Sequence, residues 1–201
     1  MSLPEGTHIS HVQLRVKDLV SELSFYRGLL GFHEANHFDS TLALSSSVPT
    51  DHGARAGQLS VQLLLTESIN AVARPPRTTG LFHVAILYPN RVELAKTLLR
   101  LIRNGYPIQG AADHLVSEAI YLADPEGNGV ELYCDRPKES WRWSNGEIAM
   151  ATEPLHVEAL LKEADGKEWT EIHPQTDIGH IHLNVGSLAR VEEFYSKQLG
   201  F

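Results

Sequence analysis

Glu131 is a carboxylate in a stretch of sequence that otherwise looks like a buried strand. It lies in "DPEGNGVELYCDRP" (124–137), where strand alternation puts Val130, Leu132 and Cys134 on one face and Glu131 on the other. The Asn-Gly pair before it predicts a type I′ hairpin turn, which would set the register of this strand. An isolated charged residue in a strand usually faces water. The residues that share its face decide whether Glu131 is isolated.

Two histidines occupy corresponding places in two other predicted strands. His11 lies on the face opposite Val12, Leu14 and Val16, and His83 lies in the same way opposite the bulky apolar residues of its own strand. A lone histidine is more often a satisfied core or surface residue than a ligand. If the two related strands pair, however, His11, His83 and Glu131 converge. Two imidazoles and one carboxylate are the ligand set of a non-haem Fe(II) centre with open coordination positions.

An internal repeat supports this pairing. "HVQLRVKDLVSELSFYRGLLGF" (11–32) aligns without a gap with "HIHLNVGSLARVEEFYSKQLGF" (180–201), and a weaker third copy covers 81–106. Each copy predicts a strand followed by an amphipathic helix, which ends at a glycine, Gly31 or Gly200 in the two stronger copies.

The order of predicted elements gives the fold class and the domain organisation. β-Rich sequence follows each of the first two strand-helix units, so we expect βαβββ twice over residues 8–135. We therefore predict an α+β fold in which paired βαβββ modules form a curved mixed sheet shaped like a cup. Residues 1–137 would form this metal-binding domain, residues 138–177 a linker, and residues 178–201 the start, a strand and a helix, of a second, incomplete domain. Within the linker, Thr152 is expected to cap a helix that has Pro154 in its first turn.

Composition excludes several function classes. The 201 residues carry a formal net charge of −8, which argues against a phosphate-binding surface and hence against nucleic acid as a partner. No apolar run approaches the ~18 residues that a membrane span needs. The N-terminal residues do not have the pattern of a secretory signal, so we expect a cytoplasmic protein. The single Cys134 rules out an internal disulfide and a zinc site built on cysteine pairs.

The paired modules and their histidines resemble the vicinal oxygen chelate superfamily, which includes glyoxalase I, bleomycin-resistance proteins and extradiol ring-cleaving dioxygenases. Within it, "HLVSEAIYLADPEGNGVE" (114–131) is similar to the extradiol dioxygenase signature. The match departs from the signature at Ala112, where another small or branched residue is preferred. Over the whole chain the likeness is to the two-domain catechol 2,3-dioxygenase type, whose chains continue beyond the position of Phe201.

The resemblance implies a reaction and a set of roles. The reaction would be insertion of both atoms of O₂ into a catechol-type aromatic diol next to its hydroxyls, as part of aromatic compound catabolism. Fe(II), with Mn(II) or another divalent metal as the alternative, would be held by His11, His83 and Glu131. His114 and Tyr121 match the positions that serve acid-base and hydrogen-bond roles. The alternative for His114 is a turn residue, and for Tyr121 a core aromatic with a satisfied hydroxyl.

Other functions stay open at this point. A glyoxalase-like metal isomerase or lyase could use Gln62 as a further ligand, and a metal-free relative could bind small molecules as bleomycin-resistance proteins do. His180 corresponds to His11 in the repeat, but a second site would lack partners in this sequence, so we assign His180 a structural role. In many two-domain extradiol enzymes the second domain is the catalytic one, which would leave the first domain as a scaffold. The unfinished third unit makes a homo-oligomer plausible.

Overall fold

The computed structural model describes residues 2–4, 6–48 and 61–201. Two modules with the same element order lie between residues 12 and 135. The first module comprises β1 (Val12–Val16), α1 (Leu19–Leu23) continuing into the wider turns of η1 (Ser24–Leu29), β2 (His33–Phe38), β3 (Thr41–Ser45) and β4 (Val61–Glu67). The second comprises β5 (Gly80–Leu87), α2 (Arg91–Arg103), β6 (Gly110–Asp113), β7 (Ser117–Ala123) and β8 (Gly129–Asp135).

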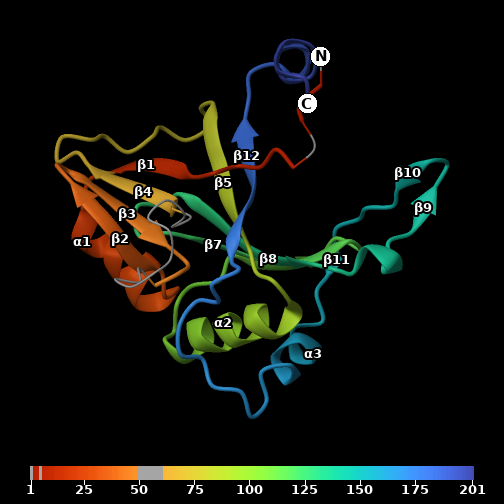
Figure 1. Ribbon diagram of the computed structural model, residues 1–201, viewed down its shortest axis with the longest axis horizontal. Helices are drawn as coiled ribbons and strands as arrows, with labels where there is room; N and C mark the ends of the chain where they lie inside the picture. Colours follow the sequence, from red (N-terminus) through yellow and green to blue (C-terminus); the bar gives the residue numbers. More distant parts are fainter. Residues whose placement is uncertain (1, 5, 49–60) are drawn as a thin grey trace.

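The two modules share one sheet topology. The strand order is β1-β4-β3-β2 in a four-stranded sheet, and the second module repeats it as β5-β8-β7-β6 within a six-stranded sheet. In both, the first strand pairs parallel with the fourth and the remaining pairs are antiparallel. Figure 1 shows the open, curved sheets with α1 and α2 on their outer faces. The predicted α+β class with paired βαβββ modules is confirmed.

Local signals in the sequence start and end the helices. Asp18 and Asn90 cap α1 and α2 by accepting hydrogen bonds from backbone N–H groups three residues on. The chain leaves η1 at Gly31, whose φ of 87° lies in the left-handed region that glycine adopts without a steric cost. Gly200, its repeat equivalent, has a φ of 86°. The predicted helix ends at these two glycines are therefore confirmed.

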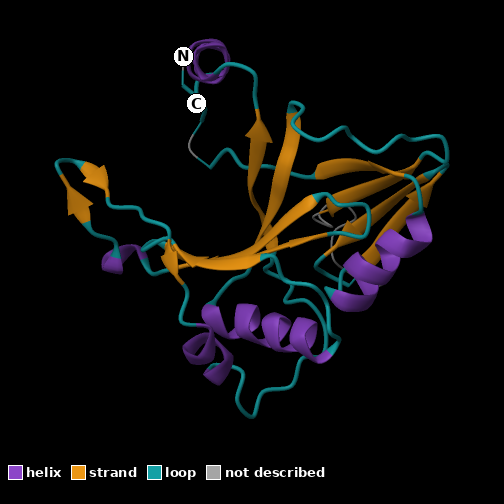
Figure 2. Cartoon of the chain, turned by 180° about the vertical axis from the view of Figure 1, so that it is seen from behind, coloured by secondary structure: helices purple, strands orange, loops and turns teal. Residues whose placement is uncertain are grey.

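The segment between the modules and the C-terminal unit contains several short elements. They are η2 (Lys138–Ser140), the hairpin of β9 (Trp143–Ser144) and β10 (Glu147–Ile148), then β11 (Glu153–Pro154) and α3 (Val157–Lys162). Figure 2 shows the hairpin reaching away from the body of the molecule. The helix begins later than predicted, because Glu153 and Pro154 pair with the edge of β6, where a proline is tolerated.

The C-terminal unit consists of β12 (Asp177–Asn184), α4 (Leu188–Glu192) and η3 (Glu193–Leu199). β12 pairs antiparallel with β5 and completes the six-stranded sheet, as the adjacent ribbons in Figure 1 show. Phe25 and Phe32 of the first copy are 2% and 1% exposed, whereas the equivalent Phe194 and Phe201 are 44% and 72% exposed. The division into domains at residues 137 and 177 stays a prediction.

None of the described helices has both the length and the apolar character needed to cross a bilayer.

Candidate metal centre

Three side chains from neighbouring strands bring their ligand atoms together. The Nε2 atom of His83 lies 2.8 Å from Oε2 of Glu131, and the Nε2 atom of His180 lies 3.1 Å from the same oxygen. The two imidazole nitrogens are 3.3 Å apart. Strand order β8-β5-β12 explains the convergence, because Ala85 of β5 pairs with Glu131 on one side and with His180 on the other.

The spacing of these atoms fits a shared metal ion. Ligands at roughly 2.0–2.2 Å from one ion lie about 3 Å from each other, and the three distances of 2.8, 3.1 and 3.3 Å are of this size. The donor set of two imidazoles and one carboxylate suits a divalent transition metal. Among the described residues, this is the group of His, Cys, Asp and Glu side chains that could hold such an ion.

Glu131 is held as an anion at the centre of this group. Burial disfavours its charged form and alone would raise its pKa. Hydrogen bonds from His180 and then His83 act in the opposite direction and lower the pKa from 4.5 to about 2. The Glu131 side chain is therefore ionised at any pH at which the protein would work, and it can serve as a charged ligand.

The structure does not bring His11 into this group. His11 is exposed, and its Nδ1 shares a hydrogen bond of 2.8 Å with the hydroxyl of its neighbour Ser10. The ligand set expected from the sequence required the strand of His11 to border the strand of His83. Instead β1 belongs to the other sheet, where it pairs with β4, and β12 occupies the edge of β5.

His180 is the residue that sequence reasoning assigned to a structural role. The repeat held the signal that could have identified it, because His180 is the equivalent of His11 and opens a strand of the same pattern. The histidine that lies beside His83 and Glu131 has the place in the repeat that the sequence predicts, but it belongs to the copy at 180–201 and not to the copy at 11–32. His182 lies close by, with its ring centroid 4.8 Å from that of His83. Burial and the neighbouring imidazoles lower the pKa of His182.

Two glycines allow the three strands to approach. A Cβ atom on Gly129 would lie 2.1 Å from the carbonyl oxygen of Phe82, directly beside His83. A Cβ atom on Gly179 would lie 1.8 Å from the hydroxyl of Tyr133, which is buried under β12. Gly129 pairs with His83 and Gly179 precedes His180, so the absence of a side chain at both positions helps set the distances within the candidate centre.

His114 and Tyr121, the predicted acid-base pair, lie next to this centre. Nε2 of His114 is 2.7 Å from the Tyr121 hydroxyl, which in turn is 3.4 Å from Oε1 of Glu131. Nδ1 of His114 is 2.8 Å from the carbonyl oxygen of Ala151. Burial and then the charge of Glu131 raise the pKa of Tyr121 to about 12, so this hydroxyl keeps its proton.

The turn before Glu131 differs from the predicted type I′ turn. Neither Asn128 nor Gly129 has a positive φ, and Gly127 takes the left-handed conformation instead. The Oδ1 atom of Asp124 accepts hydrogen bonds from the backbone N–H groups of Glu126 and Asn128, so its side chain organises a longer loop. The register survives this change, since Tyr121 still faces Glu131 across the hairpin.

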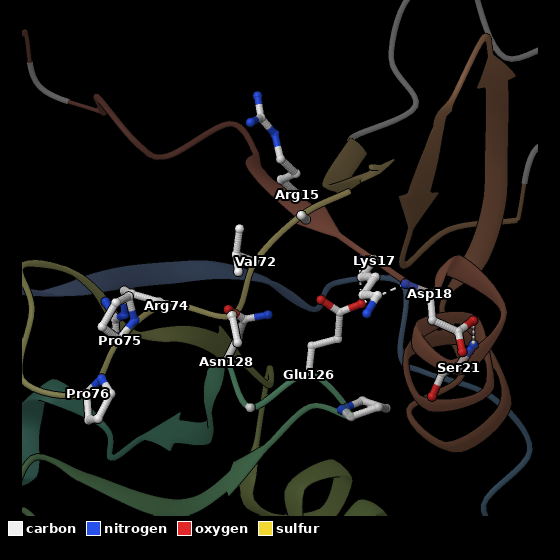
Figure 3. A pocket seen from close by; sticks show the side chains of 14 residues that line it. Arg15, Lys17, Asp18, Ser21, Val72, Arg74, Pro75, Pro76, Glu126 and Asn128 are labelled. Carbon is white, nitrogen blue, oxygen red and sulfur yellow. Dashed lines mark hydrogen bonds between the residues drawn. The ribbon is translucent and has the colours of Figure 1, made fainter. Parts of the chain in front are cut away.

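This loop is tied to the first module by two carboxyl groups, the exposed Glu126 and the buried Glu22. Glu126 accepts hydrogen bonds from the backbone N–H groups of Lys17 and Asp18, a contact that Figure 3 shows at the rim of a polar cavity. Glu22 is fully buried and accepts from the backbone N–H of Glu126, while its Oε2 atom has no hydrogen-bond partner among the described residues. Burial and then the charge of Asp124 raise the pKa of Glu22 from 4.5 to about 8.

Glu22→Gln is expected to stabilise the protein increasingly as the pH rises from about 5 to 8. The folded state holds the Glu22 proton up to about pH 8, whereas the unfolded chain releases it near 4.5. The free energy of unfolding of the wild type therefore falls through this window, and the variant lacks that loss, which is on the order of a few kcal/mol. Urea denaturation at pH 5, 6, 7 and 8 measures the difference. Glu139→Gln, at an exposed position, corrects for the changed net charge. A constant difference across this range would contradict the assignment.

Gln62 does not act as a free ligand here. Its Oε1 atom accepts from the backbone N–H of Ser46, and its Nε2 atom donates to the carbonyl oxygen of Thr176. Through these two hydrogen bonds, Gln62 connects the residues that precede β12 to the first module. No contact of Gln62 favours the isomerase alternative.

A cavity of about 500 Å³ opens beside the candidate centre. His83 and Tyr121 form part of its wall, together with the apolar side chains of Phe82, Leu122 and Val130. Its size and mixed lining are those of a small-molecule site.

Comparisons with known proteins agree with this architecture. The sequence model of the Glyoxalase/Bleomycin resistance protein/Dioxygenase superfamily matches residues 8–132. A catechol-2,3-dioxygenase from Bacillus subtilis (strain 168) is 42% identical over 202 residues, which covers 100% of this chain and 67% of that protein. A biphenyl-2,3-diol 1,2-dioxygenase 3 from Rhodococcus globerulus is 36% identical over 77 residues, or 37% of this chain and 40% of that protein.

Among solved structures, a glyoxalase/dioxygenase from Nostoc punctiforme matches with a TM-score of 0.52 and 18% identity. The match covers 68% of this chain and 98% of the other. At this level of identity the likeness concerns the fold alone, and it corresponds to the paired modules described above.

Proposed function

Because the chain belongs to the Glyoxalase/Bleomycin resistance protein/Dioxygenase superfamily, we propose that it is an extradiol dioxygenase that opens a catechol-type aromatic diol with O₂ at a non-haem Fe(II) centre. The observation that carries this proposal is the convergence of His83, Glu131 and His180 on one point, with ligand atoms 2.8 to 3.3 Å apart. The dioxygenase relatives support the reaction type. The proposed role is in the breakdown of aromatic compounds.

The proposed metal ligands are His83, Glu131 and His180. When bound, Fe(II) would supply a Lewis acid with adjacent open positions at which a diol and O₂ can meet. Glu131 contributes the negative charge of the set. Phe82 and Val130 give an apolar lining to the cavity in which the aromatic ring would lie.

His114 and Tyr121 are proposed to move protons beside this cavity. The carbonyl oxygen of Ala151 can only accept, so Nδ1 of His114 carries a proton and Nε2 of the neutral ring accepts from the Tyr121 hydroxyl. When His114 takes up a second proton, Nε2 becomes a donor and the Tyr121 hydroxyl turns toward Glu131. This pair can therefore accept a proton from the diol and return it later, with Tyr121 remaining protonated in both states.

Reconstitution tests the reaction directly. Protein purified without oxygen is loaded with Fe(II), then mixed with catechol and O₂, and formation of a yellow ring-cleavage product is followed by absorbance. Elemental analysis of the same sample gives the iron content per chain. Iron binding without ring cleavage would favour another metal-dependent reaction of the superfamily, whereas a metal-free protein that binds the diol would favour a binding module.

The His114→Ala variant is expected to keep its iron and to turn over about 100-fold more slowly or worse. The His114 imidazole is proposed to transfer protons, and it is not one of the proposed metal ligands. Tyr121→Phe should also retain iron and turn over more slowly, since it removes the hydroxyl between His114 and Glu131. His156→Ala, an exposed histidine outside the site, is the control. Loss of iron from His114→Ala, or unchanged turnover, would contradict this assignment.

A further inference from the structure

The cavity beside the candidate centre has a distinctive charge pattern. Arg74 is the one lining residue with a permanent charge, and no carboxylate lines the cavity. The remaining polar groups are neutral, namely Gln109, Tyr121 and Asn184, and the other lining residues are apolar or glycine. A neutral diol does not require a cation in its binding site, so the proposed reaction alone does not explain why Arg74 lines this cavity.

Arg74 has no protein partner for its charge. It forms no hydrogen bond and no ion pair with any residue that the structure describes. Four other arginines in the described part of the chain pair with carboxylates or backbone carbonyls, namely Arg27, Arg91, Arg100 and Arg136. The two carboxylates that line the adjoining cavity are engaged elsewhere: Glu126 accepts from the backbone N–H groups of Lys17 and Asp18, and Asp18 accepts from the backbone N–H of Ser21.

The backbone holds Arg74 at the edge of this cavity. Pro75 and Pro76 follow it, as Figure 3 shows, and the first of these prolines restricts Arg74 to an extended conformation. The side chain lies along Gly80, since a Cβ atom there would be 2.8 Å from Nη1 of Arg74. Gly80 begins β5, three residues before His83. The guanidinium thus lies beside the start of the strand that carries a proposed metal ligand.

We infer that Arg74 recognises an anionic substituent, a carboxylate, on the aromatic diol. This inference rests on the proposed function and narrows its substrate class. A guanidinium binds a carboxylate through two parallel hydrogen bonds, and it does so best when no protein carboxylate competes. The apolar wall from Phe82 to Val130 suits the aromatic ring, while Arg74 and the neutral amide of Asn184 suit its charged substituent.

A pair of substrates and a pair of arginine variants test this inference. The ratio of kcat/KM for 3,4-dihydroxyphenylacetate to that for 4-ethylcatechol is measured for the Fe(II)-loaded wild type, Arg74→Met and Arg77→Met. Arg77 is an exposed arginine in the same loop that lines none of the cavities described above. We expect the wild type and Arg77→Met to prefer the acid, and Arg74→Met to lose about tenfold of that preference. Because Arg74 is exposed, the wild-type preference should shrink as salt is added.

Equilibrium binding separates this inference from the proposed function. Anaerobic titration calorimetry of the same two diols gives their affinities whether or not the rings are cleaved. If neither diol is cleaved, the proposed function fails, but a binding preference for the acid that Arg74→Met abolishes still supports the role of Arg74. Equal affinity of the wild type for the two diols, or a preference that survives in Arg74→Met, would overturn the inference.

Discussion

His180→Ala should lose stoichiometric iron, whereas His11→Ala should keep it. The two histidines occupy equivalent positions of the repeat, so the variants remove the same side chain from the same local pattern. Only His180 lies within 3.3 Å of the other two ligand atoms, and His11 is exposed beside Ser10. Removing a residue that only hydrogen-bonds to a metal ligand lowers the metal affinity by roughly 10–100-fold. Removing a ligand itself should therefore lower the iron affinity by at least about 100-fold.

Elemental analysis after anaerobic loading measures the iron per chain, and competition with a chelator gives the affinity. His83→Ala serves as the positive control, because both the sequence and the structure include it in the set. The opposite result, in which His11→Ala loses iron and His180→Ala retains it, would put the strand of the first module beside β5 in place of β12. Equal iron in all three variants would refute the metal centre itself.

The contrast between His11 and His180 shows what sequence patterns can determine. Alternation along a strand predicted which face each histidine would occupy, and the repeat predicted that a histidine of this kind would meet His83 and Glu131. Neither pattern predicts which strand lies next to β5, because that depends on which segment of the chain reaches its free edge. Two copies of the same strand were available, and the structure uses the later one.

The loop before Glu131 illustrates a second limit. The Asn-Gly pair is a strong local signal for a two-residue turn, yet the side chain of Asp124 binds two backbone N–H groups and Gly127 takes the left-handed position. The hydrogen bonds of Glu126 and Glu22 to segments about a hundred residues away stabilise this longer loop. Such long-range contacts override a local preference, and they are not visible in a short window of sequence.

Gly129→Ala is expected to destabilise the protein strongly and to disturb the candidate metal centre. Its Cβ atom would lie 2.1 Å from the backbone oxygen of Phe82 and 3.1 Å from Cβ of His83. A backbone atom cannot move aside as the end of a flexible side chain can, so β5 and β8 must separate. We expect the free energy of unfolding to fall by about 3 kcal/mol, with a loss of iron affinity because His83 and Glu131 move apart.

Gly110→Ala is the matched control, since Gly110 lies in β6 of the same sheet and a Cβ atom there would meet nothing within 4 Å. That variant should be as stable as the wild type or more stable by about 0.5–1 kcal/mol, because alanine restricts the unfolded chain more than glycine does. Urea midpoints and iron affinities of the two variants provide the comparison. If Gly129→Ala matched Gly110→Ala in both measurements, β5 and β8 would not be in the close contact that brings His83 to Glu131, and the geometry of the centre would have to be abandoned.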